Sequence, residues 1–367
     1  MRYFIRANYG AGREDILALL PFHILVAAYS LLVTCIALWL DKAAAISHGA
    51  YFSRLGPLYL ITLPVAASVV SLCLVVHRTG TWKHRRQIMQ DYLSAGGAGR
   101  AVAGLLVLVS FIVLMGSFTT FKNLMPHFYD GFPYDQIQAD ADWLLHFGHD
   151  PGPTLVRLLP YPLLRQAVEW NYSILWSLFG FLPVFFIAVY SKAEVVRLRY
   201  LTTLAASWIV VGSILACLFL SAGPAFYGSV TGDRLRFAAV GEFLQQGQAL
   251  SSAAAFQAYL WANYEAGTSA LASGISAFPS MHVALAMLNA LFLRELSRPA
   301  GYAGFAYVAF ILFGSVYLGW HYAIDGYVSI VTVLLLHAGI RRLFQGRSET
   351  QSRWSPARPT DVSPPIR

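Results

Sequence analysis

Residues 278–293 read FPSMHVALAMLNALFL, and residues 319–335 read GWHYAIDGYVSIVTVLL. In both stretches a histidine stands at the start of an apolar run, and such runs recur along nearly the whole chain. An apolar run of about 17–25 residues is long enough to cross a bilayer as an α-helix. The two stretches therefore predict an all-α, polytopic membrane protein that carries histidines at helix ends.

The composition of the chain supports this fold class. Of its 367 residues 57% are hydrophobic and only 12% are charged, whereas about a quarter of the residues of a soluble domain are charged. The formal net charge is +8, but the basic residues follow the loops between the apolar runs. We therefore attribute the charge to membrane topology and expect no nucleic-acid partner.

The apolar runs predict eight transmembrane helices, at residues 16–40, 57–77, 101–121, 170–190, 201–221, 281–297, 302–318 and 323–343. We expect three parts. Residues 1–100 carry two N-terminal helices and a basic loop, residues 101–344 form a six-helix core with two long outer loops, and residues 345–367 form a disordered tail.

The basic residues also predict the orientation of these helices. With the N-terminus inside, most of the 26 Lys and Arg residues fall on inner segments, and many Asp and Glu residues fall on the outer ones. This bias favours a cytoplasmic N-terminus and a cytoplasmic C-terminus in a cell (inner) membrane. It places both histidine motifs on the outer, periplasmic side. In the first outer loop, Tyr134–Phe147 interleaves apolar with acidic residues and predicts a helix that lies flat in the membrane interface.

The histidine motifs carry residues suited to phosphoryl chemistry. His321 and Asp325 are four residues apart, so both lie on one helical face, where the carboxylate can hold the imidazole by its Nδ1–H. Ser280 is a good N-cap for the helix that begins after it, and the free N–H groups of that first turn form a cradle for phosphate. His282 lies in this turn. One oriented histidine and one free histidine suffice for a phosphoenzyme mechanism.

Other interpretations of these residues remain open. A single histidine at a membrane interface is commonly a structural hydrogen-bonding group. Two histidines and an aspartate could bind zinc, although no third thiolate or Glu ligand is nearby, and we expect neither a metal nor another cofactor. A non-catalytic lipid-binding or lipid-translocating protein and a secondary transporter with a proton relay are the alternative functions.

The two motifs resemble those of a known family. Pro279-Ser280-Met281-His282 and Gly319-Trp320-His321-Tyr322-Ala323-Ile324-Asp325 are similar to the second and third motifs of the type 2 phosphatidic acid phosphatase superfamily. The resemblance covers roughly residues 100–343. It implies that His321 is the nucleophile, that Asp325 orients it, and that His282 protonates the leaving group.

The sequence also departs from the family pattern. Ser315 stands where the third motif usually has arginine, and Gly223-Pro224-Ala225-Phe226-Tyr227 stands where the first motif should precede the second. Both departures, together with residues 121–126 and 144–151, resemble the branch that contains inositol phosphorylceramide synthase and bacterial relatives. That branch transfers a phospho-headgroup between lipids.

The resemblance therefore implies a lipid phosphatase or phosphotransferase that acts on a lipid phosphate or phospholipid headgroup in the outer leaflet through a phosphohistidine. The acceptor, water or a lipid alcohol, is left open, as is the oligomeric state. Because the usual arginine is absent, other groups must meet the charge of the phosphate. The candidate substrate-binding residues are Ser280, Lys122, Arg234, Arg236 and, as a neutral donor, Tyr227.

Overall fold

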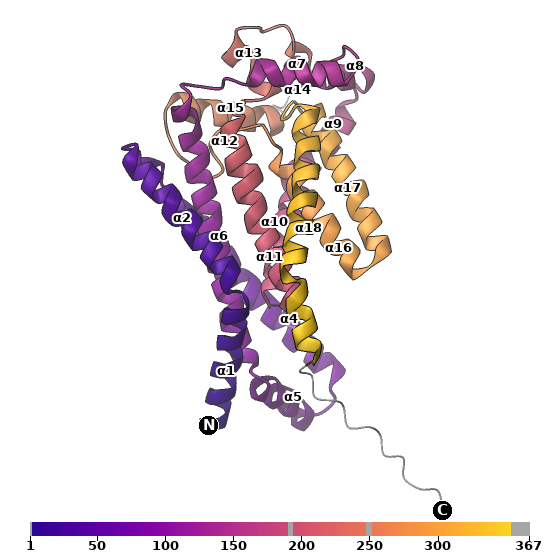
Figure 1. Cartoon of the computed structure of the whole chain (residues 1–367). Helices are drawn as coiled ribbons and strands as arrows, with labels where there is room; N and C mark the ends of the chain where they lie inside the picture. The colour runs from indigo at the N-terminus through magenta and orange to yellow at the C-terminus, as the bar shows by residue number, and fades with distance from the viewer. Residues whose placement is uncertain (1, 190–193, 247–251, 354–367) are drawn as a thin grey trace, which may run out of the picture.

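The computed structural model describes residues 2–189, 194–246 and 252–353. Every regular element within these residues is helical, and long helices form an elongated bundle (Figure 1). Among the described residues, seven helices are long and apolar enough to cross a membrane. The predicted fold class, a polytopic helical membrane protein, is confirmed.

The long helices follow the predicted runs, and several of them are composite. They are α2 (Leu20–Trp39), α3 (His48–Gly56) with η2 (Pro57–Thr62) and α4 (Leu63–Arg78), α6 (Gly97–Leu124), α9 (Pro162–Trp170) with η4 (Asn171–Leu175) and α10 (Trp176–Val189), α11 (Glu194–Ile209) with η5 (Val210–Leu215) and α12 (Ala216–Leu218), α16 (Met281–Leu296), α17 (Arg298–Tyr317) and α18 (Ala323–Arg353).

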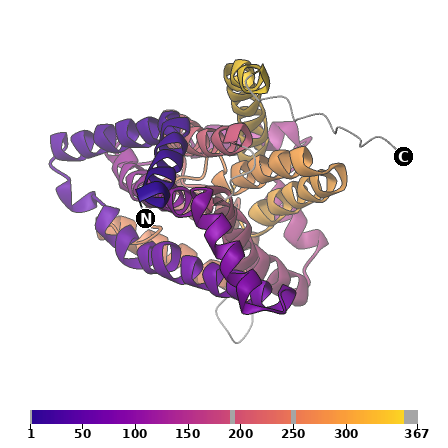
Figure 2. The ribbon, with the colours of Figure 1, turned by 90° about the horizontal axis from the view of Figure 1, so that it is seen from below.

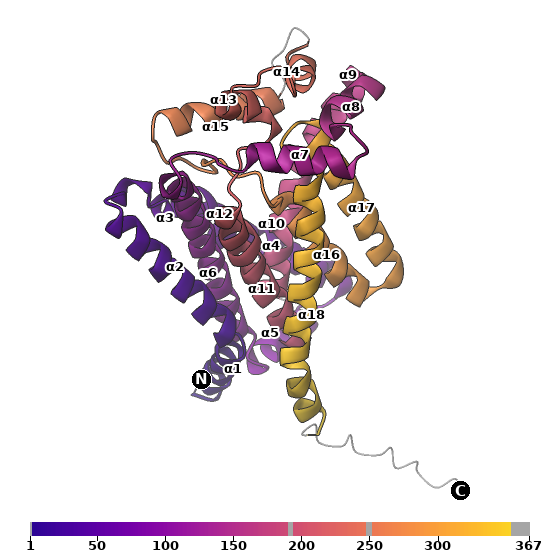
Figure 3. The ribbon, with the colours of Figure 1, turned by 45° about the horizontal axis from the view of Figure 1, so that its top comes forward.

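Shorter helices occupy the two ends of the bundle. They are α1 (Arg2–Ala18), η1 (Ala43–Ala45), α5 (Trp82–Ser94), η3 (Met125–Phe128), α7 (Asp135–Leu145), α8 (Pro151–Leu158), η6 (Pro224–Phe226), α13 (Tyr227–Thr231), α14 (Ala238–Gln245) and α15 (Ser252–Glu265). Helices α7, α8 and α13–α15 lie together over one end, here named the capped end (Figures 1 and 3). Helices α1 and α5 lie at the opposite end.

Helix α16 ends within one residue of its predicted end, whereas α18 is longer than predicted. Helix α16 has 16 residues, or about 24 Å at 1.5 Å per residue, so it is shorter than a typical span. Helix α18 continues to Arg353, into the segment predicted to be disordered, and the next proline along the chain is Pro356. The rest of the predicted tail, residues 354–367, lies outside the described residues.

Helices α16 and α17 form a tight antiparallel hairpin beside α18. A Cβ added at Gly304 would lie only 2.8 Å from the Ala290 Cα, so glycine permits the close approach of the two helices. At the tip of the hairpin the Glu295 carboxylate binds Arg199 of α11 at 2.6 Å and lies 3.5 Å from His337 of α18. These contacts fix both helices that begin with the predicted histidine motifs.

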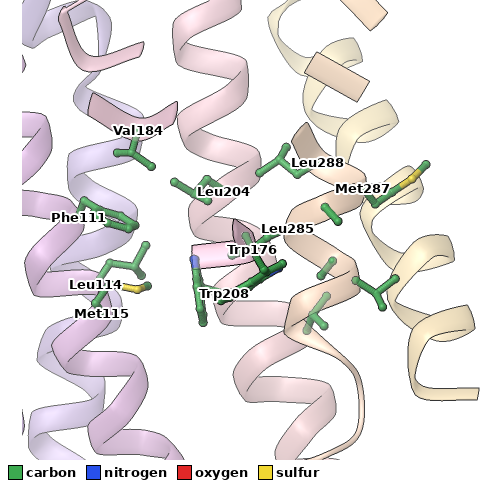
Figure 4. Close-up of a cluster of buried hydrophobic side chains, with 14 of the residues drawn as sticks. Phe111, Leu114, Met115, Trp176, Val184, Leu204, Trp208, Leu285, Met287 and Leu288 are labelled. Carbon is green, nitrogen blue, oxygen red and sulfur yellow. The ribbon is translucent and has the colours of Figure 1, made fainter. Parts of the chain in front are cut away.

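The apolar core lies between α6, α10, α11 and α16. Figure 4 shows side chains from these four helices pointing toward one another, among them Phe111, Trp176, Trp208 and Leu285. Seen from below (Figure 2), the indigo N-terminal helices lie on one side of the molecule and the orange and yellow helices α16, α17 and α18 on the other. The core therefore joins the N-terminal helices to the helices that carry the histidine motifs.

Candidate functional site

The His321 ring lies at the capped end, in the turn between α17 and α18. Its Nδ1 is 3.1 Å from Asp325 Oδ2, which is the contact expected from the four-residue spacing. The same Oδ2 accepts the backbone N–H of Tyr322 at 3.1 Å, and the Ser315 carbonyl accepts the backbone N–H of His321 at 3.3 Å. Asp325 is fully buried and His321 is 7% exposed. The imidazole is therefore held in a closed site, with Nδ1 bound to Asp325.

Burial also sets the protonation of this ring. It lowers the pKa of His321 to about 3, a hydrogen bond to the Ala277 backbone opposes the shift, and the charge of Lys122 adds to it. A buried imidazole resists protonation because the cation loses its hydration, and here burial has the larger effect although the Asp325 carboxyl lies beside the ring. His321 is therefore neutral at physiological pH, as a nucleophile must be.

Three loops meet around His321. They are joined by backbone hydrogen bonds from Ala277 N–H to Ser221 O at 2.9 Å, from Ala225 N–H to Gly319 O at 2.9 Å, and from Ser280 N–H to Asp325 O at 3.2 Å. A Cβ at Gly223 (φ +92°) would lie 2.8 Å from the Ala277 Cβ and 2.9 Å from the Trp320 carbonyl oxygen. Glycine is required there because both the conformation and the close approach exclude a side chain.

His282 lies in the first turn of α16, as expected from the sequence. Ser280 is the N-cap of this helix and its hydroxyl accepts the backbone N–H of Val283 at 3.5 Å, which confirms the predicted cap. Neither ring nitrogen of His282 forms a hydrogen bond with any of the described residues. The imidazole is held by aromatic rings instead.

Two aromatic side chains that sequence reasoning missed enclose His282. The Tyr172 ring stacks on it with centroids 4.2 Å apart and an interplanar angle of 17°, and the Trp176 ring centroid is 3.9 Å away. The Trp176 indole N–H donates to the His282 carbonyl at 3.0 Å. Both residues sit inside a long apolar run, where nothing in the sequence separates them from ordinary core aromatics.

The two histidines converge. Their ring centroids are 6.1 Å apart and the rings are inclined by 62°. Reacting atoms in a near-attack geometry are about 3–3.5 Å apart, so an atom between the two rings can be within reach of both. One ring is oriented by a carboxylate and the other has unoccupied nitrogens, which is the arrangement needed for a nucleophile and a proton donor.

Lys122, at the end of α6, is the candidate cation that the structure places beside this pair. Its ammonium acts electrostatically on both imidazoles, and its Nζ is 5.9 Å from the centroid of the Phe118 ring. No Asp or Glu of the described residues lies within ion-pair distance of it. A Cβ at Gly274 (φ +85°) would lie 3.0 Å from the Lys122 Cγ, so this glycine lets a loop pack against the lysine stem.

The other candidate phosphate ligands have different surroundings. The Arg236 guanidinium forms ion pairs with Asp150, at 3.0 Å, and with Asp140, so its positive charge is neutralised. The Tyr227 hydroxyl lies 3.4 Å from the same guanidinium. Arg236 is thus neutralised by two carboxylates, and Tyr227 lies beside it. That either residue binds phosphate stays a prediction. Arg234 is exposed and lines a separate surface cavity of about 260 Å³.

Helix α7 supplies two buried carboxylates that support the site. Asp142 accepts the backbone N–H groups of Ala323 and Ile324, both at 3.0 Å, and thus caps α18 directly after the His321 turn. Asp135 accepts the backbone N–H groups of Ala222 and Gly223 at 2.7 and 2.8 Å and the Tyr322 hydroxyl at 2.9 Å.

The sequence carried a signal for this pair. Asp135 and Asp142 are seven residues apart and therefore lie on one helical face, and both are buried. Ile137 and Leu144 lie on the opposite face and are 64% and 69% exposed. The predicted amphipathic helix is thus present as α7, and its acidic face, rather than its apolar face, packs on the protein.

Comparison with known proteins agrees with this architecture. A family model described as PAP2 superfamily matches residues 139–339, a range that begins within α7 and includes both histidine turns and more than half of α18. Neither the curated proteins nor the solved structures gave a match. Since the model covers more than half of the chain and the chain has several membrane-spanning helices, the protein belongs to the PAP2 superfamily and is a membrane enzyme of the phosphatase type.

Proposed function

We propose that the protein transfers the phosphoryl group or phospho-headgroup of a lipid, either to water or to the hydroxyl of a second lipid, through a phosphohistidine at His321. The observation that carries this proposal is the convergence of two imidazoles with centroids 6.1 Å apart, of which one bonds Asp325. The substrate is a lipid phosphate or phospholipid because the pair lies where membrane-spanning helices end.

In the first step, His321 Nε2 attacks phosphorus in line. A nitrogen–phosphorus bond forms, the bond from phosphorus to the leaving oxygen breaks, and His282 gives a proton to that oxygen. Burial lowers the pKa of His282 in the free protein, so its protonation depends on the negative charge of the bound phosphate. Asp325 holds the Nδ1–H and stabilises the positive charge that develops on the ring. The incoming phosphate replaces the contact that the ring makes with the Ala277 backbone.

In the second step, water or a lipid hydroxyl attacks the phosphohistidine. His282, now neutral, takes the proton of the attacking hydroxyl, and the nitrogen–phosphorus bond breaks. Lys122 and the N–H groups of the α16 first turn, which Ser280 caps, meet the charge of the phosphoryl oxygens. In this scheme His282, His321 and Asp325 are catalytic, whereas Lys122 and Ser280 belong to the substrate site.

The proposal also covers the branch of the superfamily and the orientation of the chain in the membrane. Ser315 in place of the usual arginine favours a headgroup transferase related to inositol phosphorylceramide synthase. The distribution of basic residues favours a capped end on the outer side of a cell membrane, with both termini cytoplasmic. Residues 101–344 then form the catalytic core behind two N-terminal helices.

Replacement of the nucleophile tests the reaction. His321→Ala should lower turnover by about 10⁴-fold or more, because the covalent route is lost. The purified protein in detergent, with EDTA present, is offered phosphatidic acid and phospholipids, with and without ceramide or diacylglycerol as acceptors. Free phosphate and lipid products are then measured, and the product identifies the acceptor.

A control shows that the loss is specific to this histidine. His84→Ala removes an exposed histidine of α5, at the opposite end of the bundle, and should retain turnover close to that of the wild-type protein. Acid-labile, base-stable labelling of the wild-type protein, but not of His321→Ala, is expected with labelled substrate. Undiminished turnover by His321→Ala contradicts the nucleophile assignment.

A further inference from the structure

Tyr172 is placed at the histidine pair by an irregular turn of helix. It belongs to η4, a π-helical segment between α9 and α10, and such segments inside α-helices are frequent at functional sites. Its side chain is 4% exposed. The stacking of its ring on His282, at 4.2 Å and 17°, fixes the plane of the phenol relative to the candidate general acid.

The Tyr172 hydroxyl makes no hydrogen bond of good geometry with the described residues in this closed site. Ser280 lies close enough to be a weak hydrogen-bond partner, and Asp325 is its nearest charged neighbour. A buried hydroxyl without a well-oriented partner is unfavourable, and this one lies beside the histidine pair, where a phosphoryl oxygen would complete its bonding. The two neighbours belong to the two histidine turns, so the hydroxyl lies where those turns meet.

We infer that the Tyr172 hydroxyl is a substrate ligand that donates a hydrogen bond to a phosphoryl oxygen held between His282 and His321. This inference rests on the proposed function and adds to it a neutral donor from η4. Such a donor strengthens as charge builds up on the phosphoryl oxygens in the transition state. Together with Lys122 it supplies contacts that Ser315 cannot make, since the Ser315 hydroxyl donates to the Leu312 carbonyl at 2.8 Å.

Asp325 offers the hydroxyl a different role. Its Oδ1 also has no hydrogen-bond partner among the residues that the structure describes, so orienting the carboxylate is an alternative role for Tyr172. The two roles differ in what they change. A substrate ligand affects the affinity for a phosphate analogue, whereas a residue that acts through Asp325 lowers kcat and leaves that affinity unchanged.

The test uses Tyr172→Phe, which removes the hydroxyl and keeps the ring that stacks on His282. Inhibition by orthovanadate is measured on the full-length protein in detergent, with a lipid phosphate as substrate. A hydrogen bond to a charged phosphoryl analogue predicts an inhibition constant about 10- to 100-fold weaker than that of the wild-type protein. Tyr307→Phe on α17 is the matched control and should leave the constant unchanged.

The outcomes separate this inference from the proposed function. An unchanged inhibition constant in an active Tyr172→Phe protein overturns the inference, and so does an equal weakening in both variants. A wild-type protein that neither turns over lipid phosphates nor binds orthovanadate overturns the proposed function as well. Should Tyr172→Phe fail to fold, 3-fluorotyrosine at position 172 keeps the shape and makes the hydroxyl a stronger donor. Tighter inhibition then supports the inference, and unaltered inhibition refutes it.

Discussion

The two histidines of the site sit against walls of opposite character. His321 is held by hydrogen bonds from a polar wall, in which Asp325 binds the ring and Ser315 binds the backbone. His282 is held by ring contacts from an aromatic wall made of Tyr172 and Trp176. The polar wall joins α17, α18 and α7, whereas the aromatic wall comes from η4 and α10.

The difference fits the two tasks that we assign to the histidines. A nucleophile must present one particular nitrogen, and a hydrogen bond to Nδ1 fixes the tautomer of His321. A group that first gives and then takes a proton needs free ring nitrogens. Stacking fixes the plane of His282 without occupying either of its nitrogens. The fold thus orients two chemically identical side chains by two different kinds of contact.

Of the changes that test this comparison, the largest effect on turnover is expected from His282→Gln, which replaces the histidine held by the aromatic wall. Loss of a general acid should slow turnover of a lipid phosphate by about 10²- to 10⁴-fold. The loss should be much smaller with p-nitrophenyl phosphate, whose leaving group needs no proton. Turnover of both substrates by the variant and the wild-type protein is compared. An equal loss with the two substrates would assign His282 to binding rather than to proton transfer.

A smaller effect is expected from Asp142→Asn, which weakens the cap on α18 next to the polar wall. The amide keeps one acceptor oxygen but cannot accept both N–H groups of the α18 first turn, so we expect a loss of about 1–2 kcal/mol in the free energy of unfolding. Turnover should fall by roughly ten-fold with little change in KM, since the His321 turn shifts while the substrate cations stay in place.

Asp140→Asn is the matched control for that measurement. Asp140 lies on the same helix, its side chain is 56% exposed, and an exposed ion pair contributes little to stability. Both variants are compared by thermal unfolding in detergent and by steady-state kinetics. If Asp140→Asn is as harmful as Asp142→Asn, the damage reflects α7 as a whole and not the cap on α18.

The smallest effect, counted per pH unit, is expected in the pH dependence of the free energy of unfolding. The pKa of His321 is about 3 in the folded protein and about 6.5 in the unfolded chain. As pH falls below about 6.5, the unfolded chain binds a proton that the folded protein does not, so stability is lost on acidification. The wild-type protein should therefore lose stability relative to His321→Asn between about pH 6.5 and 3, by at most about 1.4 kcal/mol per pH unit.

This dependence has a definite sign. Above about pH 7.5 the histidine is neutral in both states, so the difference in thermal unfolding midpoint between the two proteins should not change with pH. A wild-type protein that instead gains stability over His321→Asn on acidification would show that the folded state takes up the proton, as an imidazolium paired with Asp325 would.

Much of the fold followed from the sequence because membrane helices are determined locally. In lipid, each backbone polar group must be satisfied within its own helix, so apolar length alone predicts most spans. The start of α16 was predicted correctly since an N-cap is a short-range contact. The continuation of α18 to Arg353 was missed because the prediction ended the helix where the polar composition begins, and a polar composition does not by itself end a helix.

The candidate site also has a part that the sequence predicts locally and a part that depends on tertiary contacts. The contact between His321 and Asp325 follows from a spacing of four residues on one chain segment. The choice of cations did not follow, since Lys122, Arg234 and Arg236 look alike in a sequence. Only the structure shows that carboxylates from α7 and the adjoining loop neutralise Arg236, whereas Lys122 lies by both imidazoles with no carboxylate partner among the described residues.

The sequence by itself determined that this chain is a helical membrane protein and which two turns carry its histidines, because apolar length and i to i+4 spacing act within one segment. The tertiary structure alone decided that the two turns meet, that Tyr172 and Trp176 enclose one ring, and that Asp135 and Asp142 support the other. Those contacts join residues up to about 190 positions apart, and they form only when packing brings separate helices to one end of the bundle.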